Sequence, residues 1–205
     1  MDNQQTQQDP ERVYDEKYGI NYGNIINGSP DYTGCGVFPG EAEATDPSGF
    51  KYKYGVSQDP VEPFRLRDEK MLKLITENMP ADRKLKVIEL GSGRGGLSRY
   101  LVTELLKLDK LESFIATNLS ETENAYNVEQ AKKAGIPEGK LSVIKKNFDE
   151  MGDYADASFD LVVSNDSIIH TADPAKLMQS IARLLTPGGA LVFSDIVEGP
   201  TATRE

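Results

Sequence analysis

Apolar and polar positions follow a regular order along the second half of the chain. Runs of roughly four to eight apolar residues between turn residues are typical of buried strands. Between these runs, apolar residues recur three and four positions apart, which predicts helices with one buried face. The strands expected in this way are residues 86–90, 113–117, 141–145, 159–164 and 190–197.

The predicted helices have recognisable starting residues. Ser120 and Glu123 have the spacing of a capping box, Asp173 precedes Pro174 as a helix cap, and Asp59 is expected to cap the first helix. The residues expected to face inward are Phe64, Met71, Leu72, Ile75, Met79, Leu97, Tyr100, Leu101, Leu105, Leu108, Leu177, Met178, Ile181, Leu184 and Leu185.

Strands that alternate with helices through short loops predict a doubly wound α/β domain with a parallel sheet and right-handed crossovers. We expect this domain over residues 81–205, preceded by a helical or lid segment over residues 1–80. Residues 28–54 are rich in Gly, Pro, Asp and Ser, which predicts a long irregular loop that is either a functional lid or disordered.

The composition excludes several function classes. Lys and Arg total 23 against 33 for Asp and Glu, a formal net charge of −10, so nucleic acid is not an expected partner and a positively charged ligand suits the chain better. The single cysteine, Cys35, excludes an internal disulfide and indicates a reducing compartment. No apolar stretch reaches the ~20 residues of a membrane span. We therefore expect a cytoplasmic protein with no membrane partner and no metal.

Candidate chemistry gathers where the first predicted strand of the sheet turns into a helix. Gly91, Gly93 and Gly96 have the G-x-G-x-x-G spacing, which lets backbone approach a ligand beside the positive end of a helix. Glu89 occupies a strand position where a dinucleotide fold places an apolar residue, and a carboxylate there suits an ammonium group better than a pyrophosphate. Asn118, rather than an acid, closes the second strand, 27 positions after Gly91 instead of about 20. Both features argue against a nicotinamide dinucleotide.

The chain resembles class I S-adenosylmethionine-dependent methyltransferases. The resemblance is clearest in the segment Glu89-Leu-Gly-Ser-Gly-Arg-Gly95 and in the turn Leu185-Thr-Pro-Gly-Gly-Ala-Leu191, and it includes the residues between them. This resemblance covers residues 85–197 and implies a Rossmann-like fold, S-adenosylmethionine as cofactor and S-adenosylhomocysteine as product. An acid is usual in the family where this chain has Asn118. The cofactor-binding residues that the resemblance implies are Glu89, Gly91, Ser92, Gly93, Asn118, Leu119, Asn147, Phe148 and Asn165.

Residues 18–28 and 164–170, together with Asn118, are similar to sarcosine and dimethylglycine N-methyltransferases. The resemblance implies N-methylation of a small amine, although the tryptophan and histidine expected near the amino terminus are absent. Methyl transfer to oxygen or sulfur of a small acid, a nicotinamide-dependent oxidoreductase and a non-catalytic cofactor-binding module are the alternatives. His170 and Tyr22 are the candidate catalytic residues.

Each of the polar candidates has a simpler interpretation. His170, the only histidine, either orients or deprotonates the acceptor or merely forms a hydrogen bond within its loop. Tyr22 belongs to a tyrosine stripe that either contacts a methylammonium group or packs. Arg65 and Arg67 either pair with an acceptor carboxylate or remain solvated. Asp160 is expected to accept hydrogen bonds from backbone amides.

The family sheet that the resemblance implies has seven strands in an order that begins 3-2-1-4-5, and the final two strands are absent here. Residues 190–197 would then form a bare apolar edge, which is an aggregation hazard. We therefore expect either that the chain is a fragment of a longer polypeptide or that another chain, as in a homo-oligomer, covers this edge.

Overall fold

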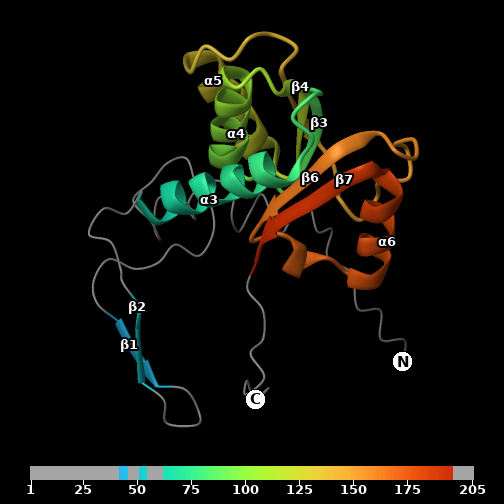
Figure 1. The fold of residues 1–205 in the computed structure, drawn as a ribbon. Helices are drawn as coiled ribbons and strands as arrows, with labels where there is room; N and C mark the ends of the chain where they lie inside the picture. The colour runs from blue at the N-terminus through green and yellow to red at the C-terminus, as the bar shows by residue number, and fades with distance from the viewer. Residues whose placement is uncertain (1–41, 46–50, 55–61, 196–205) are drawn as a thin grey trace, which may run out of the picture.

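The computed structural model describes residues 42–45, 51–54 and 62–195 (Figure 1). Strands β1 (Ala42–Thr45) and β2 (Lys51–Tyr54) form an antiparallel pair. The prediction of an irregular loop over residues 28–54 is therefore wrong for these two segments. The sequence of β2, KYKY, alternates long polar and aromatic residues, a pattern that favours a strand and that the abundance of turn residues around it obscured. Tyr14, Tyr18, Tyr22, Cys35 and Asp59 lie outside the described residues.

The main sheet has five strands, all parallel, in the order β5-β4-β3-β6-β7. This is the predicted 3-2-1-4-5 order, which confirms the doubly wound α/β fold. Strand β7 begins five positions earlier than predicted, because the turn before residue 190 already pairs with β6 across a register shift. The strands are β3 (Leu85–Leu90), β4 (Leu111–Asn118), β5 (Leu141–Lys145), β6 (Phe159–Asn165) and β7 (Leu185–Ser194).

Helices cover both faces of this sheet. Successive residues of a strand point to opposite faces, and accordingly Val87 of β3 packs in one hydrophobic cluster and Ile88 in the other. The first cluster includes residues of α3 and α4, and the second includes residues of α6, which lies on the other side of the sheet (Figure 1). The helices are α3 (Glu62–Asn78), α4 (Gly96–Lys107), α5 (Glu121–Lys133), the short 3-10 helix η1 (Ile168–His170) and α6 (Pro174–Leu184).

The predicted helix starts are confirmed where the structure describes them. The Ser120 side chain accepts a hydrogen bond from the Glu123 backbone amide at 3.2 Å, and the Asp173 side chain accepts one from the amide of Lys176 at 3.1 Å. Leu108 and Met178 were expected to face inward, but 49% and 37% of their surfaces are exposed. Leu108 lies beyond the last residue of α4, so helical periodicity no longer directs it to the core.

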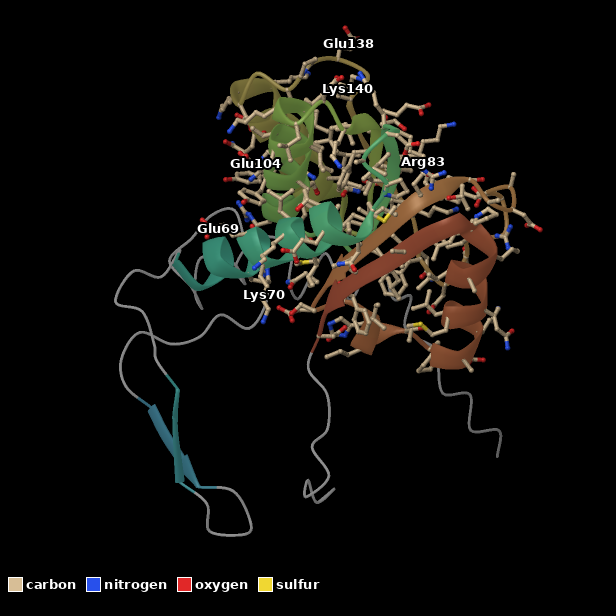
Figure 2. The ribbon with its side chains drawn as sticks, viewed as in Figure 1. Glu69, Lys70, Arg83, Glu104, Glu138 and Lys140 are labelled. Carbon is tan, nitrogen blue, oxygen red and sulfur yellow. The ribbon has the colours of Figure 1, made fainter. Side chains whose placement is uncertain are left out.

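Asp160 joins strands at the amino end of the sheet, as predicted. Its Oδ2 accepts a hydrogen bond from the backbone amide of Lys86 at 2.9 Å, and its Oδ1 lies 3.0 Å from a guanidinium nitrogen of Arg83, which precedes β3 and is labelled in Figure 2. Thr186 also donates to Asp160 Oδ1 at 3.0 Å. Polar contacts therefore fix this end of the sheet.

Three further expectations concern membranes, metal ions and the edge of the sheet. No described helix combines the length and the apolar character that a membrane crossing needs. Residues 42–45, 51–54 and 62–195 also contain no group of three His, Cys, Asp or Glu side chains that could hold a metal ion. Strand β7 forms one edge of the sheet, and Phe193 on it is 48% exposed. That the chain is a fragment, or that another chain covers this edge, stays a prediction.

Candidate functional site

The loop between β3 and α4 bends back over the carboxyl edge of the sheet. The backbone amides of Gly91 and Ser92 both donate to the carbonyl oxygen of Thr117, at 2.9 and 2.8 Å, so the loop is attached to the end of β4. Gly91 and Gly95 have φ angles of 74° and 79°, in the left-handed region that residues with a side chain rarely adopt. The glycines therefore fix the path of this loop.

Gly91 also brings three segments of the chain together. A Cβ atom at this position would lie 2.4 Å from Ser167 Oγ and 3.6 Å from Phe148 Cε1. Ser167 Oγ donates to the carbonyl oxygen of Gly91 at 3.0 Å. Two of the predicted cofactor-binding residues, Gly91 and Phe148, are therefore neighbours in space although 57 positions separate them in the sequence.

Glu89, near the end of β3, is buried against the start of α4. It is 1% exposed, and its carboxylate accepts a hydrogen bond from Ser98 Oγ of α4. Burial raises the pKa of Glu89 from 4.5 to about 7, the hydrogen bond from Ser98 opposes this rise, and the charge of the buried Asp68 adds to it. Arg67, which was expected either to bind an acceptor carboxylate or to be solvated, forms an ion pair with Asp68 at 2.6 Å.

Asn118 at the end of β4 has a carboxylate beside it. Its side-chain nitrogen donates to Glu123 Oε2 at 2.9 Å, and Asn124 donates from its side chain to the carbonyl oxygen of Asn118 at 3.2 Å. Both Asn118 and Glu123 are buried. A carboxylate thus lies beside the end of β4 although Asn118 itself is an amide, and it comes from the first turn of α5. Sequence reasoning assigned Glu123 only to the capping box, although its position five residues after Asn118 was the available signal.

The segment after β5 contains Asn147, Phe148 and a residue that sequence reasoning missed. Asn147 Oδ1 accepts a hydrogen bond from the backbone amide of Asp149 at 3.0 Å. The Asp149 carboxylate in turn accepts hydrogen bonds from Thr171 Oγ1 and from the amide of Ala172, the latter at 3.1 Å. No local pattern marks Asp149, because its partners lie more than twenty positions further along the chain.

The segment after β6 places His170 at the same edge. Asn165 donates from its side-chain nitrogen to Asp166 Oδ2 at 3.1 Å, and Asp166 has a φ of 48° without being glycine. Burial raises the pKa of Asp166, and the positive charge of Arg67 opposes the rise. His170 ends the 3-10 helix and is exposed, with its backbone amide donating to the carbonyl oxygen of Ser167 at 3.0 Å. The left-handed conformation of Asp166 is a form of backbone strain, and such strain often marks a functional segment.

Several buried polar atoms near this edge have no hydrogen-bond partner within the described residues. Buried polar groups are normally hydrogen-bonded, so each exception indicates a missing partner. Among the described residues, the exceptions lie in the glycine loop, in the α5 segment that faces it, and at the end of β6. They are Ser92 Oγ, Arg94 Nε, Asn124 Oδ1, Asn127 Nδ2 and Asn165 Oδ1. The edge that carries the predicted site therefore suits a ligand with several polar groups.

Comparison with known proteins identifies the domain. The profile of a family described as a methyltransferase domain matches residues 88–193, more than half of the chain. The chain is 38% identical over 109 residues to dimethylglycine N-methyltransferase of Parasynechococcus marenigrum, covering 53% of this chain and 36% of that protein. It is 29% identical over 150 residues to glycine/sarcosine/dimethylglycine N-methyltransferase of Actinopolyspora halophila, covering 73% and 25%.

Solved structures agree with this result. A protein of Galdieria sulphuraria, provisionally assigned as a sarcosine dimethylglycine methyltransferase, superposes with a TM-score of 0.60 at 28% identity, covering 67% of this chain and 49% of that one. The chain thus spans between a quarter and a half of the length of these relatives. The resemblance predicted from the glycine loop is confirmed: the chain belongs to the methyltransferase domain family, among the class I S-adenosylmethionine-dependent enzymes.

Proposed function

We propose that this domain binds S-adenosylmethionine at the carboxyl edge of β3, β4 and β6. We further propose that the protein methylates the nitrogen of a small amine such as sarcosine or dimethylglycine. The observation that carries the proposal is the meeting of the glycine loop with Phe148 and Ser167 at one point of this edge. Ligands of open α/β sheets bind at such an edge.

Each predicted cofactor-binding residue has a proposed task. Ser92 and Gly93 belong to the loop that would hold the amino-acid end of the cofactor, with Asn165 beside it, and Glu89 supports this loop through Ser98. The ring of Phe148 would contact the adenine. The unpartnered oxygen and hydroxyl atoms at this edge supply hydrogen-bonding capacity. We also propose that Asn147 contacts the adenine. The segment of Asn118 and Leu119, which lies beside Glu123, would contact the ribose hydroxyls.

Methyl transfer to an amine mainly requires that the methyl donor and the acceptor nitrogen be aligned. When bound, the cofactor supplies a methyl group already activated on a sulfonium, so the protein needs to hold the acceptor in line and keep water out. An amine attacks only in its neutral form, and imidazole is well suited to take up a proton near neutral pH. We therefore propose that His170 orients or deprotonates the acceptor. Tyr22, the other proposed catalytic residue, lies outside the described residues.

The amine acceptor is supported by the names of the relatives. Four matching proteins are named as N-methyltransferases of sarcosine or dimethylglycine, at 29% to 38% identity. The chain covers at most 48% of each of them, so their acceptors are carried over here as a proposal. A panel of small amines, thioethers and hydroxy acids with labelled S-adenosylmethionine would identify the acceptor atom. We expect label in the amines only. Label only in the hydroxy acids would replace the proposal with O-methyl transfer, and label only in the thioethers with S-methyl transfer.

Cofactor binding is tested by isothermal titration with S-adenosylhomocysteine and NADH. We expect the first to bind and the second not to. Gly91→Ala should weaken S-adenosylhomocysteine binding at least tenfold, because its methyl group would collide with Ser167. Gly135→Ala is the matched control: its φ of 71° imposes the same backbone strain, but nothing lies within 4 Å of the added methyl group. Equal affinity in the two variants would contradict the proposed site.

A further inference from the structure

Asp149 lies between two segments that the sheet does not connect directly. The segment after β5 contains Asn147, Phe148 and Asp149, and the segment after β6 leads through η1 to Thr171. In the sheet, β4 and β3 stand between β5 and β6, so these strands are about 14 Å apart at a strand spacing of about 4.8 Å. The segment after β5 crosses this distance and packs with residues of β6 and α6 through Met151, so Asp149 can contact the segment after β6.

The Asp149 carboxylate makes this contact with both of its oxygens. Oδ1 accepts a hydrogen bond from Thr171 Oγ1, and Oδ2 accepts one from the backbone amide of Ala172 at 3.1 Å. Thr171 Oγ1 also accepts a hydrogen bond from the amide of Asp173 at 3.3 Å, which joins the same point to the cap of α6. Hydrogen bonds to a charged acceptor are stronger than neutral ones, so this junction holds both segments firmly.

Each end of the junction continues into the proposed site. On the first side, the amide of Asp149 donates to Asn147 Oδ1, and Phe148 lies against Gly91. On the second side, His170 immediately precedes Thr171, and its amide donates to the carbonyl oxygen of Ser167. The carboxylate thus joins the residues proposed to contact the adenine to the residue proposed to act on the acceptor.

We propose that Asp149 is a positioning residue that couples the cofactor side of the site to the acceptor side through Thr171. The inference depends on the proposed function for the identity of the two sides. Its consequence is specific: removal of the Thr171 hydroxyl, on the acceptor side, should weaken cofactor binding. If Thr171 only stabilised the loop after β6, removal of its hydroxyl would leave cofactor binding unchanged.

The test compares variants at both ends of the junction. Thr171→Val and Asp149→Asn should each weaken S-adenosylhomocysteine binding about three- to tenfold in isothermal titration, the range expected for losing a partly exposed charged hydrogen bond. The double variant should bind S-adenosylhomocysteine with about the affinity of whichever single variant has the lower affinity, because both changes break the same junction. Thr171→Ser, which keeps the hydroxyl, should bind like the wild type, and so should Glu129→Gln on the exposed face of α5.

The outcomes separate this inference from the proposed function. If Thr171→Val binds S-adenosylhomocysteine as tightly as Thr171→Ser, or if the two single effects simply add, the coupling is wrong while cofactor binding stands. If the wild type does not bind S-adenosylhomocysteine, the proposed function fails, and amide hydrogen exchange then decides the coupling. Faster exchange in residues 147–150 of Thr171→Val supports the coupling, and unchanged exchange there overturns it.

Discussion

The two sides of the proposed site are built in different ways. The glycine loop after β3 is attached by backbone hydrogen bonds to β4 and lies over the buried carboxylate of Glu89. The segment after β6 is more exposed: His170 is on the surface, and Ile169, with 49% of its surface exposed, is held by a backbone hydrogen bond to the Asp195 side chain at 3.1 Å. The cofactor side is thus part of the core, whereas side-chain contacts position the acceptor side. Changes on the first side should therefore affect stability, and changes on the second should affect turnover.

The largest loss of stability is expected from Gly95→Ala. The added methyl group would lie 1.9 to 2.1 Å from atoms of the Asn127 amide, and Asn127 is fully buried. Overpacking and a left-handed conformation together should lower the free energy of unfolding by about 3 kcal/mol, measured by urea denaturation. Gly139→Ala has the same φ of 79° with nothing within 4 Å, and should cost only about 1 kcal/mol. Similar losses in the two variants would show that the contact with Asn127 is unimportant.

A dependence of stability on pH is the next effect, and it arises from Glu89. Its pKa rises from 4.5 in the unfolded chain to about 7 in the folded one, so between these values the folded state binds more protons. Stability contributed by the protonated acid is therefore present below about pH 4.5 and is lost as the pH rises toward 7. Glu89→Gln removes this titration and should be more stable than the wild type at pH 8, by roughly 3 kcal/mol as an upper bound.

Urea denaturation at pH 5, 6, 7 and 8 measures this difference. The gap between the wild type and Glu89→Gln should widen as the pH rises, whereas Glu129→Gln, at an exposed position of α5, should follow the wild type at every pH. A constant gap would mean that Glu89 does not titrate in this range. Such a result would also weaken the distinction between a core-like cofactor side and an exposed acceptor side.

An intermediate effect is expected from Glu123→Gln, at the boundary between core and site. The change replaces the charged acceptor of the hydrogen bond from Asn118 with a neutral one and should lower stability by about 1 kcal/mol. S-adenosylhomocysteine affinity should fall about tenfold if this carboxylate takes the place of the acid that the family usually has at the position of Asn118. Glu121→Gln, an exposed change in the same helical turn, is the control, and an equal affinity for both variants would remove Glu123 from the site.

The sequence predicts the fold better than the site, for a physical reason. The strands and the caps at Ser120 and Asp173 depend on residues within four positions of one another, so the local pattern is sufficient to predict them. The glycine loop is also local. The partners of Asp149 lie more than twenty positions away, so only the tertiary structure brings them together. The hydrogen bond from Ser98 to the Glu89 carboxylate depends in the same way on how α4 packs against β3.

The smallest effect on stability is expected from His170→Gln, and it tests the acceptor side alone. The side chain is exposed at the end of η1, so the free energy of unfolding should change by less than about 0.5 kcal/mol. If His170 deprotonates the acceptor, kcat for methyl transfer should fall about a hundredfold while S-adenosylhomocysteine affinity stays unchanged. Turnover against each acceptor and titration of the same preparation measure both quantities. Unchanged turnover would assign His170 a simple hydrogen-bonding role and move the search for the proton acceptor to Asp166, whose pKa burial raises.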